Sequence, residues 1–163
     1  MQNQRYSKPD SVKELQNIIF AEKVKKYKIT PPELLVKQQY RDDTANGLTK
    51  CICDFIRLHN GQAERINSMG RPIDRRQTFT DVVGITRTIG SVEWVPGTTT
   101  AGTADVSATI KGQSVKIEIK IGSDHQSQAQ KDYQRNIETA GGIYYIARNF
   151  TTFVEWYIIN FDL

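Results

Sequence analysis

Hydrophobic residues in the first third of the chain recur at helical spacing. Apolar side chains at positions 12, 15, 18, 19 and 24 predict a helix over residues 11–27. Ser11 followed by Glu14 predicts a capping box at its start, and Pro31-Pro32 ends it, with a second short helix opening at Pro32. A broader apolar stripe predicts a buried helix over 44–59, which Asn60-Gly61 ends.

Beyond this helix the pattern changes to strands. QAERIN (62–67) predicts a short strand, residues 68–77 predict a turn-rich loop, and 79–94 predict strand-like pieces. Strict alternation in 105–110 and again in 114–121, with a turn at 111–113, predicts a hairpin whose isoleucines face a core.

The last third alternates again between helix and strand. Residues 127–140 predict a helix that Gly141-Gly142 ends, and the aromatic and β-branched run at 142–148 predicts a buried strand. A final apolar helix is expected from Thr151 or Thr152. This order predicts an α/β domain with a mixed β-sheet over 41–163, preceded by an N-terminal helical extension over 1–40.

Composition excludes several classes of protein. None of the apolar runs in the 163 residues approaches the ~18 residues of a membrane helix, so no membrane association is expected. The polar start lacks the apolar stretch of a secretory signal. Cys51 and Cys53 lie too close for a disulfide framework and read as buried thiols, so a reducing cytoplasm is expected.

The net charge of +4 is compatible with a nucleic-acid partner without requiring one. Arg71, Arg75 and Arg76 cluster in the expected loop and are candidates for contacts with DNA phosphates. Lys131 and Arg135 share one face of the expected helix 127–140 and are candidates for the same role. A solvated basic surface is the alternative.

Three charged residues gather at one end of the expected hairpin. Glu118 and Lys120 are two apart, so both project from one face, which we expect to be the open one. With a turn at 111–113, Asp105 pairs near residues 119–121 and lies beside them. Two close carboxylates repel unless a cation lies between them, and such oxygen ligands suit Mg²⁺ or Mn²⁺. The alternative is a surface hairpin with an ordinary ion pair.

The motifs around these residues add a resemblance. G-T-A-D, then 12 residues, then E-I-K, then S-Q-A-Q opening a helix, then Gly-Gly before a strand, resembles the PD-(D/E)XK nuclease superfamily. The closest resemblance is to its VRR-NUC branch, found in phage and mobile-element proteins and in some DNA-repair nucleases. The match covers about residues 44–150 and implies a restriction-endonuclease-like mixed β-sheet flanked by helices.

The resemblance implies roles for individual residues. Asp105 and Glu118 would be metal ligands, the backbone carbonyl of Ile119 would complete the metal shell, and Lys120 would be the catalytic lysine. Gln130 would reach back from the helix start to the catalytic site, together with Ser127, which we also count among the candidate DNA contacts.

Two departures from the family pattern stand out. Ala104 replaces the proline before the aspartate, and the helix 44–59 carries no glutamate where many members have one. Asp54 and Glu64 are the nearby acids. We favour Glu64 as a further metal ligand, since Asp54 lies in a mostly buried stretch and reads equally as structural.

The sequence therefore predicts a Mg²⁺- or Mn²⁺-dependent deoxyribonuclease that hydrolyses phosphodiester bonds in phage or mobile-element DNA processing. Its expected partner is DNA, and its expected place is the cytoplasm of a bacterial or phage-infected bacterial cell. Relatives often form homodimers, so the resemblance implies a homodimer for this chain as well. Two alternatives stay open: a catalytically impaired nuclease fold that binds DNA, and an unrelated α/β interaction protein. Tyr144 is expected in the core or at its rim.

Overall fold

The computed structural model describes residues 6–67, 70–95, 97 and 100–161. Contacts divide the chain into two compact units: residues 1–66 with 101–163, here called the body, and residues 67–100, here called the ribbon. The described part of the chain contains no helix that is long and apolar enough to cross a membrane.

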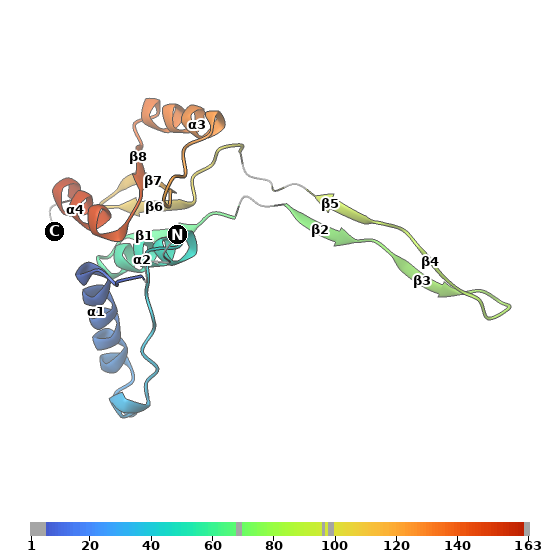
Figure 1. Cartoon of the computed structure of the whole chain (residues 1–163), viewed down its shortest axis with the longest axis horizontal. Coiled ribbons are helices and arrows are strands. Elements are labelled where there is room, and N and C mark those ends of the chain that lie inside the picture. The colour runs from blue at the N-terminus through green and yellow to red at the C-terminus, as the bar shows by residue number, and fades with distance from the viewer. Residues whose placement is uncertain (1–5, 68–69, 96, 98–99, 162–163) are drawn as a thin grey trace. The chain divides into compact units, whose positions relative to one another are not determined.

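The body is built on a four-stranded mixed sheet, as the sequence predicts (Figure 1). The strand order is β1-β6-β7-β8; the pairs β1–β6 and β6–β7 are antiparallel, and β7–β8 is parallel. The parallel pair exists because a helix, α3, connects β7 to β8. The strands are β1 (Gln62–Arg65), β6 (Val106–Ile110), β7 (Gln113–Ile119) and β8 (Ile143–Ala147).

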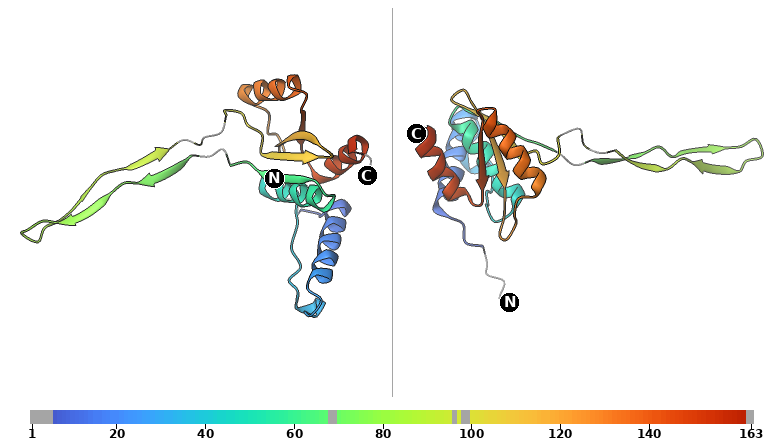
Figure 2. Two further views of the ribbon diagram at one scale, coloured as in Figure 1. Left: turned by 180° about the vertical axis from the view of Figure 1, so that it is seen from behind. Right: turned by 90° about the horizontal axis from the view of Figure 1, so that it is seen from above.

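Helices cover both faces of this sheet. The core lies on one face, where Ile52 and Ile56 of α2 and Phe153 of α4 join the inward row of the strands. Helix α3 lies on the opposite face from α2 (Figures 1 and 2). The helices are α1 (Asp10–Lys26), the 3-10 turn η1 (Pro32–Leu34), α2 (Ala45–Leu58), α3 (Gln128–Thr139) and α4 (Phe150–Phe161).

The expected boundary near residue 40 does not separate two units. Val12 and Leu15 of α1 are fully buried in the same core as α2 and α4, and Tyr40 is buried there as well. Because the first helix contributes to this core, residues 1–66 belong to one unit with 101–163. The N-terminal segment is therefore a layer of the body.

The helix starts test the capping predictions. The expected capping box at Ser11 is wrong: α1 begins at Asp10 without a side-chain cap, and Ser11 Oγ instead lies 2.8 Å from Thr151 Oγ1. Ser127 caps α3 in a complete capping box. The last helix begins at Phe150, before both threonines expected to cap it, and Phe150 itself packs into the core.

The ribbon is a two-stranded antiparallel hairpin made of two successive ladders. Its strands are β2 (Arg71–Asp74), β3 (Gln77–Thr80), β4 (Thr86–Ile89) and β5 (Val92–Val95), with β2 paired to β5 and β3 to β4. The expected loop over 68–77 is therefore wrong for 71–74 and for Gln77. Pro72 is compatible with a strand here because each strand of a two-stranded ribbon has one open edge. Residues 68 and 69 lie outside the described residues.

Candidate active site

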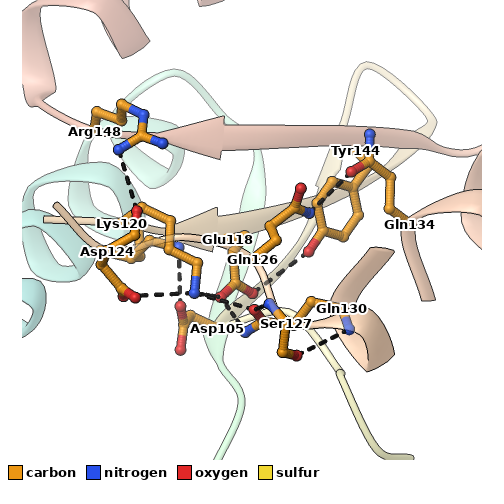
Figure 3. A network of polar contacts seen from close by, with 11 residues as sticks. Asp105, Glu118, Lys120, Asp124, Gln126, Ser127, Gln130, Gln134, Tyr144 and Arg148 are labelled. Atoms are coloured by element: carbon orange, nitrogen blue, oxygen red, sulfur yellow. Dashed lines mark hydrogen bonds and ion pairs between the residues drawn. The ribbon is translucent and has the colours of Figure 1, made fainter. Parts of the chain in front are cut away.

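The hairpin between β6 and β7 sets the position of Asp105. Val106 lies opposite Ile117, so the next residue back falls beside Glu118 rather than at 119–121. The register differs from the expectation because the turn is a tight pair, Lys111-Gly112, with positive φ at both residues. The Asp105 carboxylate accepts the N–H of Ile119 at 2.9 Å (Figure 3).

Glu118 and Lys120 lie together, as period two predicts, but they are not on an open face. Glu118 is 2% exposed and Lys120 is 5% exposed. Helix α3 and a tyrosine of β8 account for the difference: Gln130 Nε2 donates to Glu118 Oε1 at 2.5 Å, and Tyr144 Oη donates to Glu118 Oε2 at 3.4 Å. Each carboxylate oxygen of Glu118 thus accepts a hydrogen bond, and the side chain is shielded from solvent.

The Lys120 ammonium is at the centre of the cluster (Figure 3). Its Nζ lies 3.1 Å from Glu118 Oε1, 3.1 Å from Gln130 Oε1 and 3.5 Å from Asp124 Oδ2. The backbone N–H of Lys120 donates to the Ala147 carbonyl at 2.9 Å, which ties this residue to β8. Both the charge and the main chain of Lys120 are therefore fixed.

Gln130 reaches the cluster because of the way α3 begins. Its side-chain carbonyl accepts the Ser127 N–H at 2.9 Å, and Ser127 Oγ accepts the Gln130 N–H at 3.3 Å. The same amide therefore completes the capping box and binds both members of the Glu118–Lys120 pair. The start of α3 and the ion pair hold each other in place.

Electrostatics distinguish Glu118 from an ordinary ion-paired acid. Burial raises the pKa of Glu118, and the neighbouring Asp105 charge raises it further, against the opposing effect of Lys120. Burial and the Glu118 charge also raise the pKa of Tyr144, so this phenol stays protonated and can donate to the carboxylate. The Lys120 ammonium lowers the pKa of Glu118 by less than burial and the Asp105 carboxylate together raise it.

The structure adds three residues that sequence reasoning missed. Asp124 forms an ion pair with Lys120, and Arg148 NH1 donates to the Asp124 carbonyl at 3.3 Å. Tyr144 is half-buried, near the expected rim, but its hydroxyl points to Glu118 (Figure 3). Tyr144 lies opposite Lys116 in the β7–β8 ladder, and this register puts its side chain on the same face of the sheet as Glu118. The register cannot be read from the sequence.

The two acids considered in place of a helix glutamate differ in their surroundings. Asp54 accepts hydrogen bonds from Tyr40, Lys50 and Arg57 at 2.7, 2.7 and 3.2 Å, which is a structural network. Glu64 is exposed on β1 opposite Ser107, which itself lies opposite Lys116, so Glu64 is on the sheet face that carries Glu118. Among the described residues, no group of three or more histidine, cysteine or acidic side chains is placed to hold a metal. The structure thus brings Asp105 and Glu118 together, and the role of Glu64 as a further metal ligand stays a prediction.

The candidate DNA contacts fall in both units. In the ribbon, Arg75 forms an ion pair with Glu93 at 2.6 Å and Arg76 with Asp74 at 2.7 Å, so both face carboxylates of this chain. Arg71 is an exposed residue of β2. In the body, the candidates on α3 are exposed: Ser127, Lys131 and Arg135.

The cysteines follow the sequence expectation. Cys51 and Cys53 are free and buried in the core. Burial raises the pKa of Cys51 to about 12, which removes it as a nucleophile near neutral pH.

Comparison of the chain with protein-family models, with curated proteins and with solved structures finds no match. The geometry of the body and the spacing of its motifs are what point to a function. Both centre on Asp105, Glu118, Lys120 and Gln130.

Proposed function

We propose that the chain is a metal-dependent deoxyribonuclease with a restriction-endonuclease-like fold of the VRR-NUC type. One observation carries the proposal: a buried Glu118–Lys120 pair is bound by Gln130, which completes the capping box of the next helix, beside a second carboxylate, Asp105. The motif resemblance gives a role to each of these residues.

The order of elements supports the proposal. The strand that bears E-I-K is β7, the helix opened by S-Q-A-Q is α3, and the strand after Gly141-Gly142 is β8, which lies parallel to β7. This connection brings the helix start over the end of β7, where Glu118 and Lys120 lie. A chance E-I-K on a surface hairpin would not require a capped helix at that place.

The donor set fits a hard divalent cation. Two carboxylates are oxygen donors, the resemblance adds the backbone carbonyl of Ile119, and Mg²⁺ is commonly bound by one or two carboxylates while it keeps several waters. Burial, and then the neighbouring Asp105 charge, raise the pKa of Glu118, so a bound cation would stabilise its ionised form. When bound, Mg²⁺ or Mn²⁺ would polarise the phosphodiester and lower the pKa of a water.

The chain's own residues would orient and stabilise the reacting groups. Asp105 is held in place by the Ile119 amide, and Glu118 by Gln130 and Tyr144. Lys120 is placed to orient a water or to offset charge that develops on the phosphate in the transition state. Because Lys120 is buried and fixed, it needs little reorganisation during the reaction.

The setting that we propose is phage or mobile-element DNA processing in the bacterial cytoplasm. A second candidate function is DNA binding by a nuclease fold without cleavage. The observation that favours it is the engagement of Asp54, the only acid of α2, by Tyr40, Lys50 and Arg57, so that α2 supplies no metal ligand.

A nuclease panel separates the two functions. Plasmid, single-stranded and four-way-junction DNA are incubated with the protein, with Mn²⁺, with Mg²⁺ or with EDTA. Asp105→Asn and Asp54→Asn variants, purified in parallel, report any contaminating nuclease. We expect metal-dependent cleavage by the wild type and by Asp54→Asn, and none by Asp105→Asn. Binding of DNA without cleavage by the wild type would favour the second function.

A further inference from the structure

The ribbon exposes an unusual set of large apolar side chains. Val82 at its tip is fully exposed, Val83 is 75% exposed, and Trp94 in β5 is 61% exposed. Four more apolar residues of the ribbon are exposed: Phe79, Ile85, Ile89 and Val92. Apolar surface gathered in this way marks an interaction site rather than a solvated surface.

The pairing places these side chains in rows. In the outer ladder, the threonines form one face, where Thr78 bonds Thr88 and Thr80 bonds Thr86. The alternation puts Phe79 and Ile89 on the other face, where they lie opposite Arg87 and Gln77. In the inner ladder, Pro72 lies opposite Trp94, and Val92 shares their face opposite Asp74.

A two-stranded ribbon with such surfaces is marginally stable at best in water. Independent stability generally needs three or more strands with a buried face. Strands β2 to β5 pair only within the ribbon, in two ladders that follow each other along one hairpin (Figure 2). The ribbon therefore needs a further surface to cover its apolar rows.

The charges on the ribbon indicate what kind of surface this is. Residues 67–100 hold four arginines and three carboxylates, a net charge of +1. Three of the arginines lie in ion pairs: Arg75–Glu93, Arg76–Asp74 and Arg87–Asp81. A phosphate backbone or an anionic membrane would be attracted weakly by these arginines and repelled by their carboxylates. A second ribbon carries the same nearly balanced charge, with its arginines paired in the same way, so two ribbons can approach each other without strong repulsion.

We propose that the ribbon is the docking surface for the ribbon of a second copy of this chain. Two ribbons related by a twofold axis present the same face to each other, so the apolar side chains of one copy can pack against those of the other. Together they supply four strands, which exceeds the number that a stable sheet requires. This interface uses no residue of the Glu118 cluster, so it does not depend on the proposed nuclease activity.

Sedimentation equilibrium of the full chain tests the proposal without DNA or metal. The wild type is compared with a ribbon variant, Phe79→Ser/Ile89→Ser/Trp94→Ser, and with a matched body variant, Ile29→Ser/Leu34→Ser/Val36→Ser, whose three side chains are at least as exposed. Over about 1 to 100 µM, we expect a wild-type dimer, a dissociation constant raised about tenfold or more in the ribbon variant, and no change in the body variant.

A fluorescence measurement keeps the proposal testable if the ribbon variant folds poorly. In a Trp156→Phe background, Trp94 is the sole tryptophan, and its emission should shift to longer wavelength as dilution separates the copies. A wild type that stays monomeric at about 100 µM, or a ribbon variant that dimerises as tightly as the wild type, would overturn the proposal. So would a monomer that loses DNA binding in the ribbon variant, since the ribbon would then be a DNA contact.

Discussion

Two carboxylates of the body, Asp54 and Glu118, lie in clusters of similar composition and differ in their electrostatics. Each accepts hydrogen bonds from a lysine and a tyrosine. Burial alone would raise the pKa of Asp54, but hydrogen bonds from Lys50 and Tyr40 outweigh it, so that its pKa is lowered. For Glu118 the balance is the reverse, and its pKa is raised.

The difference comes from the neighbours of each acid. Asp54 has two cations, Lys50 and Arg57, and remains partly solvated. Glu118 is more deeply buried and has a second carboxylate beside it. An acid whose charge is satisfied in this way stabilises a fold, whereas an acid with uncompensated charge lowers stability unless a cation binds. This contrast is the reason to assign a function to one cluster and a structural role to the other.

The largest expected effect concerns the two lysines of these clusters. Lys120→Ala should lower the cleavage rate by about 100-fold or more while DNA affinity stays within a few fold, because the ammonium acts mainly in the transition state. Lys50→Ala removes the matching ion pair at Asp54 and should leave cleavage unchanged. Single-turnover cleavage and filter binding measure both quantities. Wild-type cleavage by Lys120→Ala would remove this lysine from the mechanism.

The stability of the metal-free protein should separate the same clusters in the opposite sense. Asp54→Ala leaves three donors without their acceptor and should cost about 2 kcal/mol of unfolding free energy. Asp105→Asn removes a like charge beside Glu118, keeps an oxygen for the Ile119 amide, and should be neutral or slightly stabilising.

Urea unfolding with EDTA present gives both free energies. A cost for Asp105→Asn as large as that for Asp54→Ala would show that the Glu118 cluster is structural as well.

The pH dependence of stability should have opposite signs at the two acids. Because the folded-state pKa of Asp54 is lowered from 3.8, its contribution is present above that value and is lost as pH falls through the folded-state pKa. Because the folded-state pKa of Glu118 is raised from 4.5, its contribution is present below that value and is lost as pH rises through the folded-state pKa.

Unfolding free energies with EDTA, measured against pH, should therefore diverge. The wild type should lose stability relative to Asp54→Asn as the solution is acidified, and relative to Glu118→Gln as pH rises above about 4.5. If the stability of the wild type relative to Asp54→Asn and its stability relative to Glu118→Gln changed with pH in the same direction, the electrostatic difference between the clusters would be contradicted.

The smallest expected effects concern the basic side chains considered as DNA contacts, some of which already face carboxylates of this chain. Arg75 and Arg76 are paired within the ribbon, so Arg75→Ala/Arg76→Ala should change DNA affinity little. Lys131→Ala should lower the slope of log affinity against log salt by about one, since Lys131 is exposed on α3 and has no ion pair within the described residues. Fluorescence anisotropy at several salt concentrations measures the DNA affinity of both variants. A large loss in Arg75→Ala/Arg76→Ala with no change in Lys131→Ala would make the ribbon the DNA contact.

The sequence predicted most elements of the body because its periodicities are strong. The hairpin of β6 and β7 and the helix opened by Ser127 are local features that short segments determine. It misjudged the register at Asp105 by at least one residue, since turn length depends on the φ angles of Lys111 and Gly112. It also misjudged the environment of Glu118, because alternation tells which side chains share a face but not what covers that face.

The ribbon and the ion-pair partners could not be read in the same way. Asp124 and Tyr144 reach the cluster through tertiary placement, which no spacing along the chain encodes. Arg75 and Arg76 read as a basic patch in the sequence, while the structure sets a carboxylate against each. Composition gives the number of charges but not their partners.

Binding of Mn²⁺ to the wild type and to matched variants tests the central claim most directly. At a metal concentration ~100 times the dissociation constant, the folded wild type should gain about 2.7 kcal/mol, visible as a higher melting temperature. Asp54→Asn should keep this shift, whereas Asp105→Asn and Glu118→Gln should lose most of it. If Mn²⁺ stabilises the Asp105→Asn and Glu118→Gln variants as much as the wild type, the metal site lies elsewhere and the proposed active site is wrong.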